Sequence, residues 1–82
     1  MLKITAKISG MSCSMCEAHI NDLIRNRFPV KKVTSSHKQG ETVILTEQEI
    51  TFAQLDAALG GFGYELTNLR SEPYVKKGLF RR

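Results

Sequence analysis

Residues 2–16, L-K-I-T-A-K-I-S-G-M-S-C-S-M-C, decide how this chain folds, because they join the pattern of a strand to the start of a helix. Apolar and polar residues alternate from Leu2 to Ser9, which is the period of a strand with one buried face. Gly10 ends the alternation. Apolar residues then recur at helical spacing, which predicts an amphipathic helix over residues 14–27. A strand, a short loop and a helix are therefore expected here, and the loop holds both cysteines of the chain.

Four further segments are expected beyond this unit. They are strands over residues 30–37, 42–46 and 63–69 and a helix that starts after Thr51 and contains Phe52, Leu55 and Leu59. Gly40 lies in the turn between the first two of these strands, where a hairpin favours a positive φ. The three apolar residues of the helix are at the spacing of a buried face. Gly60 and Gly61 are expected to end this helix in the left-handed conformation.

The order strand, helix, strand, strand, helix, strand predicts an α+β fold, the ferredoxin-like βαββαβ sandwich. This fold has a four-stranded antiparallel sheet with two helices on one face. The third strand should then lie between the first two, and the loops at residues 10–16, 37–41 and 61–64 should meet at one end. With 82 residues the chain has room for one hydrophobic core. We therefore expect one domain over residues 1–69, followed by a tail over residues 70–82.

The net charge of +4 belongs to this tail. Residues 1–69 carry seven basic and seven acidic side chains, whereas residues 70–82 carry five basic and one acidic. Nucleic-acid binding by the domain is therefore disfavoured, since it requires a basic face. For the tail we expect a frayed terminus, with two alternatives: a strand-like extension, or a basic and apolar element in weak contact with a membrane surface or an acidic partner.

A cytoplasmic location is expected from two features of the sequence. No apolar run approaches the roughly 20 residues of a membrane span. The first ten residues alternate polar with apolar, unlike the apolar block of a signal peptide.

The two cysteines, Cys13 and Cys16, are separated by two residues at the expected start of the first helix. Two cysteines are too few for a disulfide scaffold. The partial positive charge of a helix N-terminus favours the thiolate form, which prepares cysteines as nucleophiles or metal ligands. A C-x-x-C motif also occurs in thiol-disulfide oxidoreductases, but here no aromatic residue or proline flanks the cysteines as it does in those proteins.

The segment G-M-S-C-S-M-C, residues 10–16, at the end of the first strand of a βαββαβ pattern resembles the heavy-metal-associated domain family. That family includes small cytoplasmic copper chaperones and the N-terminal metal-binding domains of copper-transporting P-type ATPases. The resemblance covers residues 2–69. It implies that Cys13 and Cys16 bind one soft metal ion, first Cu(I), with Hg(II), Zn(II) and Cd(II) as alternatives. Thiolates are soft donors that suit Cu(I), whereas zinc prefers four ligands.

The same resemblance implies a carrier and not an enzyme. Such a protein passes copper by thiolate exchange to a P-type ATPase or to a copper-responsive repressor, and two copies can share one ion in a metal-bridged homodimer. The resemblance also implies that Met11 turns inward beneath the loop and that Tyr64 lies over it.

Three other side chains near the motif have two interpretations each. His19 extends the motif to C-x-x-C-x-x-H, but a histidine on the flank of a helix is more often a surface residue than a third ligand. His37 should lie at the same end of the sheet, and a histidine at the end of its strand is favoured over a ligand. Met15 is expected to be exposed and to contact a partner rather than donate its thioether to the metal.

Overall fold

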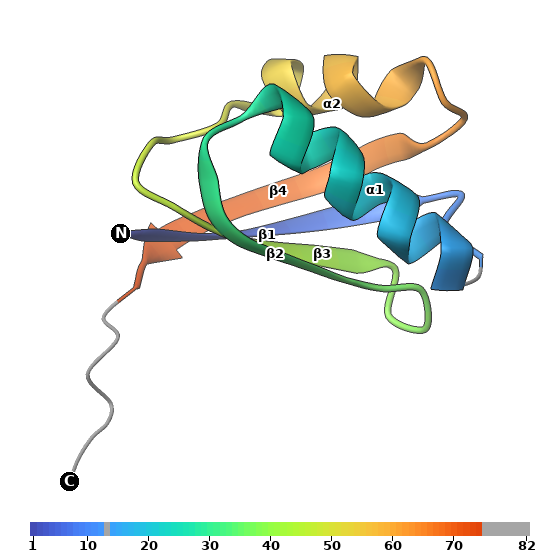
Figure 1. Cartoon of the computed structure of the whole chain (residues 1–82), viewed down its shortest axis with the longest axis horizontal. Helices are drawn as coiled ribbons and strands as arrows, with labels where there is room; N and C mark the ends of the chain where they lie inside the picture. The colour runs from blue at the N-terminus through green and yellow to red at the C-terminus, as the bar shows by residue number, and fades with distance from the viewer. Residues whose placement is uncertain (13, 75–82) are drawn as a thin grey trace, which may run out of the picture.

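The computed structural model describes residues 1–12 and 14–74, and these form four strands and two helices. In chain order the elements are β1 (Leu2–Ser9), α1 (Ser14–Arg27), β2 (Val30–Ser36), β3 (Glu41–Thr46), α2 (Phe52–Gly60) and β4 (Glu65–Pro73). This order confirms the predicted ferredoxin-like βαββαβ fold. Both helices cover the same face of the sheet (Figure 1).

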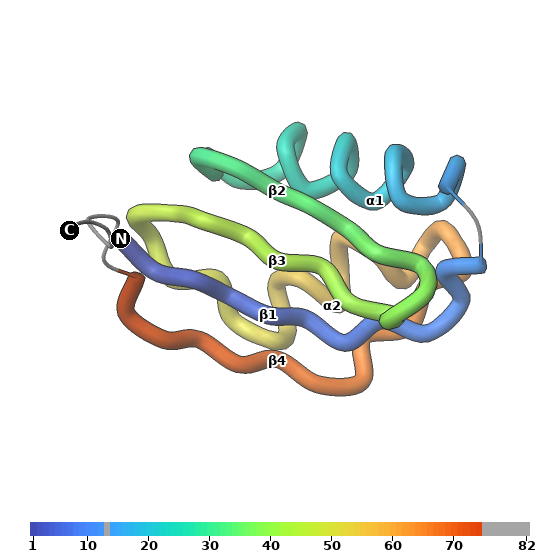
Figure 2. Tube along the Cα trace, turned by 90° about the horizontal axis from the view of Figure 1, so that it is seen from below, coloured from blue at the N-terminus to red at the C-terminus, as the bar shows by residue number. Residues whose placement is uncertain are grey.

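The sheet has the strand order β2-β3-β1-β4, and each neighbouring pair is antiparallel. Strand β3 therefore lies between β1 and β2, as expected (Figure 2). The register between β1 and β4 shifts between Lys7 and Ile8. A second irregularity lies in the pairing of β2 with β3, where the register shifts between Val30 and Lys32.

The hydrophobic core lies between the sheet and the helices. Alternate residues of β1 face it, and α1 contributes Ile20 and Ile24 while α2 contributes Leu55 and Leu59; all four are fully buried. Each buried side chain of this size stabilises the fold by about 1.5–3 kcal/mol. The strand residues that complete the core are Ile4, Ala6, Ile8, Val33, Ile44 and Leu66.

Two polar side chains, Thr42 and Thr46, are buried beside this core, and the Thr42 hydroxyl group is hydrogen-bonded to another side chain. The Ser35 hydroxyl donates to Asn21 Oδ1 at 2.6 Å. Its single proton is then used, so the Thr42 hydroxyl donates to Ser35 Oγ at 2.9 Å. These bonds satisfy the buried group and connect β3 through β2 to α1.

Helix α2 differs from the prediction at both ends. Phe52 is 45% exposed and is not a core residue, because the buried stripe runs through Leu55 and Leu59 and Phe52 lies at its edge in the first turn. Ile50, which precedes the cap, is buried instead with 3% exposure. The expected left-handed helix end was also wrong, because Gly61 is right-handed with φ −73°.

The start of α2 is fixed by a capping box. The Thr51 hydroxyl accepts from the Gln54 backbone N–H at 3.2 Å, and Gln54 Oε1 accepts from the Thr51 backbone N–H at 3.0 Å. We expect Thr51→Ala to lower the free energy of unfolding by about 1 kcal/mol, because it leaves a helix N–H without its acceptor. Urea denaturation measures this. The double variant with Gln54→Ala should lose less than the sum of the two single losses, and strict additivity would argue against a reciprocal cap.

Strand β4 is longer than predicted. Its pairing with β1 continues to Leu2 opposite Pro73, so residues 70–73 belong to the sheet, as the alternative of a strand-like extension predicts. The reason is that β1 starts at Leu2 and offers a partner along its whole length. Residues 75–82 lie outside the described residues, and the expected contacts of the tail stay a prediction. Neither helix in the described part of the chain has the length and apolar character needed to span a membrane.

Candidate metal centre

The cysteine loop, the β2–β3 hairpin and the segment before β4 meet at one end of the molecule, as predicted (Figure 1). The Ile8 backbone N–H donates to the Gly40 carbonyl at 2.8 Å, which holds the end of β1 against the hairpin. Gly40 has φ +66°, the positive value expected for this turn. The loop thus starts from a fixed position.

Gly10 brings the loop close to the segment before β4. It has φ +99°, and a Cβ atom at this position would lie 2.8 Å from the Gly63 carbonyl oxygen. Such a distance is shorter than any ordinary contact, and β-carbon-bearing residues rarely adopt this φ. Gly10 therefore allows the loop and the segment to touch through their backbones.

Of the two predicted ligands, Cys16 lies in the first turn of α1, and Cys13 lies outside the described residues. Cys16 is half-buried and packs against the edge of the core. Its place at the N-terminus of a 14-residue helix exposes it to the positive end of the helix dipole. Met15, one residue earlier, is 79% exposed, as expected.

Met11 and Tyr64 both pack beneath or beside the loop. Met11 is buried within the core, so the inward orientation implied by the resemblance is confirmed. Tyr64 is buried too, and its ring lies next to Gly10. The loop therefore rests on a sulfur-containing aliphatic side chain and an aromatic one.

His19, one turn after Cys16, belongs to an aromatic cluster that the sequence did not predict. Its Nδ1 is 3.0 Å from the Tyr64 hydroxyl. Its ring makes edge-to-face contacts with Phe62 and Tyr64, with centroid distances of 5.3 and 5.6 Å. His19 lies at the surface, as expected for the flank of a helix, but one ring nitrogen already has a partner in the protein.

Glu17 and His37 form a second contact that the sequence did not predict. Glu17 Oε2 accepts from the His37 backbone N–H at 2.7 Å and lies 2.6 Å from His37 Nδ1. His37 thus joins the hairpin to the first turn of α1. The sequence signal that could have indicated this contact was an acidic residue in the first turn of α1, at the same end of the fold as a histidine after β2. The spacing in the sequence, 20 residues, gave no indication that they would touch.

The His37 backbone N–H, followed by its ring, holds the pKa of Glu17 below the ordinary value of 4.5. A carboxyl group with a lowered pKa stabilises the fold above its unfolded pKa, and the stabilisation is lost as the pH falls through the folded pKa. We therefore expect the free energy of unfolding to decrease below about pH 4.5. The measurement is urea denaturation at several pH values. In Glu17→Gln this part of the decrease should disappear, and an unchanged pH profile would contradict the assignment to Glu17.

No protein-family model matches the chain. Among curated proteins, it is 32% identical over 63 residues to the mercuric reductase of Shigella flexneri. The matched part is 77% of this chain but 11% of the reductase, so the chain spans about one tenth of that enzyme.

Several solved structures, including the following two, are similar over most of the chain. The N-terminal domain of ZntA in the Zn(II) form has a TM-score of 0.70 and 27% identity, covering 92% of this chain and 97% of the domain. The metallochaperone CopZ has a TM-score of 0.70 and 18% identity, covering 79% of this chain and 98% of CopZ. The match to CopZ is one of fold.

Proposed function

Since this chain is a domain of the heavy-metal-associated type, we propose that it binds one soft metal ion through Cys13 and Cys16 and carries it to another protein. The observation that carries this proposal is the place of Cys16 in the first turn of α1, where the positive end of the helix dipole favours the thiolate form. Glu17 Oε2 and His19 Nδ1, which lie nearby, make polar contacts with His37 and Tyr64. Among the described residues, no group of three or more histidine, cysteine, aspartate or glutamate side chains is placed to hold a metal ion, so we base the site on the two cysteines of the motif.

A donor set of thiolates selects soft ions. Cu(I) accepts two sulfur ligands, and we propose it as the principal cargo. Hg(II) is the second candidate, supported by the 32% identity to a mercuric reductase. Zn(II) is favoured by the similarity to ZntA, but it prefers four ligands. Cd(II) is a further alternative with the same soft donors.

Transfer by ligand exchange fits the surroundings of the motif. A thiolate of the partner would attack the ion first, and one of the sulfurs of this chain would leave afterwards, so the ion is never released into water. Met15, next to Cys16, and Phe62, whose ring contacts His19, are 79% and 54% exposed and supply apolar surface near the motif for such a partner. The similarity to the N-terminal domain of ZntA supports a metal-transporting ATPase as this partner, with a copper-responsive repressor or a second copy as alternatives.

In this proposal the chain is a carrier and not an enzyme. We place it in the cytoplasm, where cysteine thiols stay reduced. A thiol-disulfide oxidoreductase would instead cycle between dithiol and disulfide, and a reductase-coupled assay would detect its turnover.

Competition titration tests the choice of metal. The reduced protein is titrated with Cu(I), Hg(II) and Zn(II) against chelators of known affinity, and X-ray absorption then counts the sulfur and nitrogen ligands. We expect one Cu(I) per chain with sulfur ligands alone. If the chain bound Hg(II) more tightly than known two-thiolate sites do, mercury would be assigned as its cargo. A nitrogen ligand in the X-ray absorption spectrum would indicate that His19 also binds the metal. Absence of binding for all three ions would refute the proposal.

A further inference from the structure

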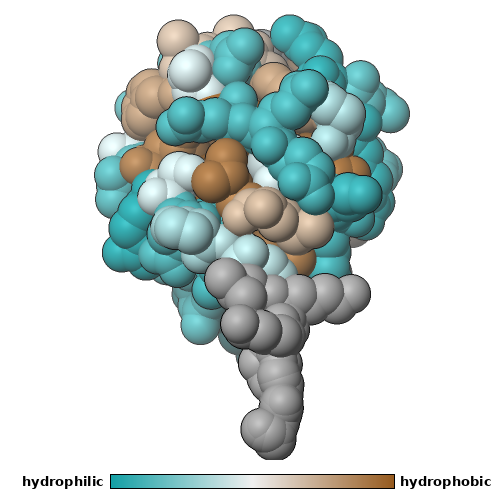
Figure 3. All heavy atoms as spheres, turned by 90° about the vertical axis from the view of Figure 1, so that its left-hand side faces the viewer, coloured by the Kyte–Doolittle hydropathy of each residue, from teal (hydrophilic) through white to brown (hydrophobic). Residues whose placement is uncertain are grey.

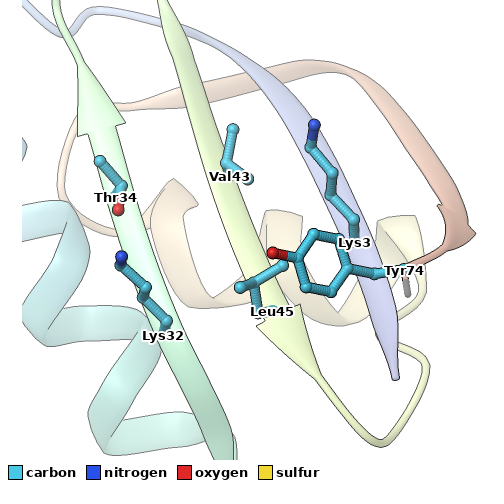
Figure 4. A pocket seen from close by; sticks show the side chains of 6 residues that line it. All are labelled: Lys3, Lys32, Thr34, Val43, Leu45 and Tyr74. Atoms are coloured by element: carbon cyan, nitrogen blue, oxygen red, sulfur yellow. The ribbon is translucent and has the colours of Figure 1, made fainter. Parts of the chain in front are cut away.

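The face of the sheet opposite the helices carries a hollow of about 280 Å³ (Figure 4). We name it the lysine hollow, and its lining residues are Lys3, Lys32, Thr34, Val43, Leu45 and Tyr74. An adjoining hollow is lined by Met1 and Lys31 and shares Lys32, Leu45 and Tyr74 with the first. The two therefore form one continuous surface at the end of the sheet that holds the N-terminus.

The lysine hollow combines an apolar floor with positive edges. Val43 and Leu45 project from β3 in its middle, and the ring of Tyr74 lies beside Leu45 (Figure 4). Lys32 lies on one side and Lys3 on the other. At the adjoining end of the molecule, apolar side chains gather among hydrophilic ones (Figure 3). An occupant of this surface needs both negative charge and apolar groups.

Three carboxylates near this surface lie close to cations other than Lys3 and Lys32, and the first of them, Glu47, is 3.8 Å from the N-terminal ammonium group of Met1. Glu41 Oε2 lies 2.7 Å from Lys7 Nζ, which holds the pKa of Glu41 low. Glu72 is opposite Lys3 in the register of β1 and β4, but its carboxylate forms its ion pair with the Arg70 guanidinium, at 3.9 Å. Within residues 1–12 and 14–74, no carboxylate forms an ion pair with the Lys3 or Lys32 ammonium group. The positive charge of the hollow is therefore available to a partner.

Two candidate occupants are disfavoured by charge. A second copy docking through the same face would bring its own lysines against those of the first. The chain that follows Tyr74, V-K-K-G-L-F-R-R, has four basic residues and no acidic one, so it does not complement the hollow. Both would add positive charge to a site that already has an excess.

We infer that the lysine hollow docks the protein on a membrane surface of anionic phospholipids. Lipid phosphates can pair with Lys3 and Lys32 while the apolar floor meets the glycerol and upper acyl region. A tyrosine such as Tyr74 suits this boundary, since its ring is apolar and its hydroxyl is polar. An acidic protein would satisfy the lysines too, but a bilayer also accommodates the basic and apolar residues that follow Tyr74 in the sequence.

This docking leaves the metal centre accessible. The lysine hollow lies at the end of the sheet that carries the N-terminus, and the cysteine loop lies at the opposite end (Figure 1). A protein held at the membrane by the hollow would present Met15 and Cys16 away from the lipid contact. The inference concerns the metal-free protein and does not depend on which ion is carried.

Vesicle flotation with the full, reduced, metal-free chain tests the inference. We expect binding to vesicles of phosphatidylcholine and phosphatidylglycerol in equal amounts, and none to phosphatidylcholine alone. In the double variant Lys3→Glu/Lys32→Glu, binding to the anionic vesicles should fall at least tenfold, because each lysine near the surface contributes about a fivefold change in affinity. Circular dichroism confirms that both proteins are folded.

A matched control changes the net charge equally at other places. Arg27→Glu/Lys38→Glu alters the end of α1 and the hairpin turn, and it should lose much less binding than the hollow variant. If the two variants lost vesicle binding equally, the loss would come from the change in net charge alone, and the inference would be overturned. Binding to polyglutamate with no binding to anionic vesicles would also overturn it, by assigning the hollow to an acidic protein.

Discussion

Cys16→Ser is expected to lower the Cu(I) affinity by about two orders of magnitude while the protein stays folded. Structural Zn(II) sites with four protein ligands have a binding free energy of roughly 10–16 kcal/mol. By this measure one ligand contributes about 3 kcal/mol, which is about 100-fold in affinity. A hydroxyl is a poor donor for a soft ion, and serine matches cysteine closely in size. Competition against a Cu(I) chelator measures the affinity, and urea denaturation measures the stability.

Ser14→Ala is the matched control, because it changes a residue of the same helix turn without removing a sulfur. It should bind Cu(I) as the unaltered protein does. Cys13→Ser should show the same loss as Cys16→Ser. If Cys16→Ser kept its full Cu(I) affinity, its sulfur would not be a ligand and the proposed carrier function would fail.

Gly10→Ala is expected to have the largest effect on stability among substitutions near the metal centre, a loss of about 3 kcal/mol. Two costs add at this position. The backbone has φ +99°, and the new Cβ would lie 2.8 Å from the Gly63 carbonyl oxygen. A backbone oxygen cannot move aside as a flexible side chain can, so the loop or the segment before β4 must shift. Urea denaturation measures the loss.

Gly61→Ala provides the control for this prediction. Gly61 has φ −73°, and a Cβ there would meet nothing within 4 Å. The free energy of unfolding of the Gly61→Ala variant should therefore change by less than about 1 kcal/mol. Equal effects of the two substitutions would show that the close approach at Gly10 is not what destabilises the protein.

The elements of the fold were predictable from sequence because their signals are local. The alternation in β1 and the helical spacing in α1 are regular, and their bounds agree with the prediction to within a residue. Phe52 was assigned wrongly because helical spacing gives a face but not where the face ends. The length of β4 was underestimated because it depends on a partner, β1, which is more than 60 residues away for Pro73.

The candidate site was predictable only in part. The C-x-x-C motif is a local signal, and the burial of Met11 followed from the resemblance. The contacts from Glu17 to His37 and from His19 to Tyr64 join residues that are 20 and 45 positions apart. No local pattern carries such information, because it depends on how three loops are brought to the same end of the sheet.

The strand order also affects how the protein behaves at high concentration. Within the part of the chain that the structure describes, the outer strands β2 and β4 each have a neighbouring strand on one side only, and such an edge can template fibrils in other proteins. Here β2 carries Lys31 and Lys32 at its irregular pairing, and β4 ends in a proline that has no N–H to donate. A cell could therefore keep many copies in solution without strand-to-strand aggregation.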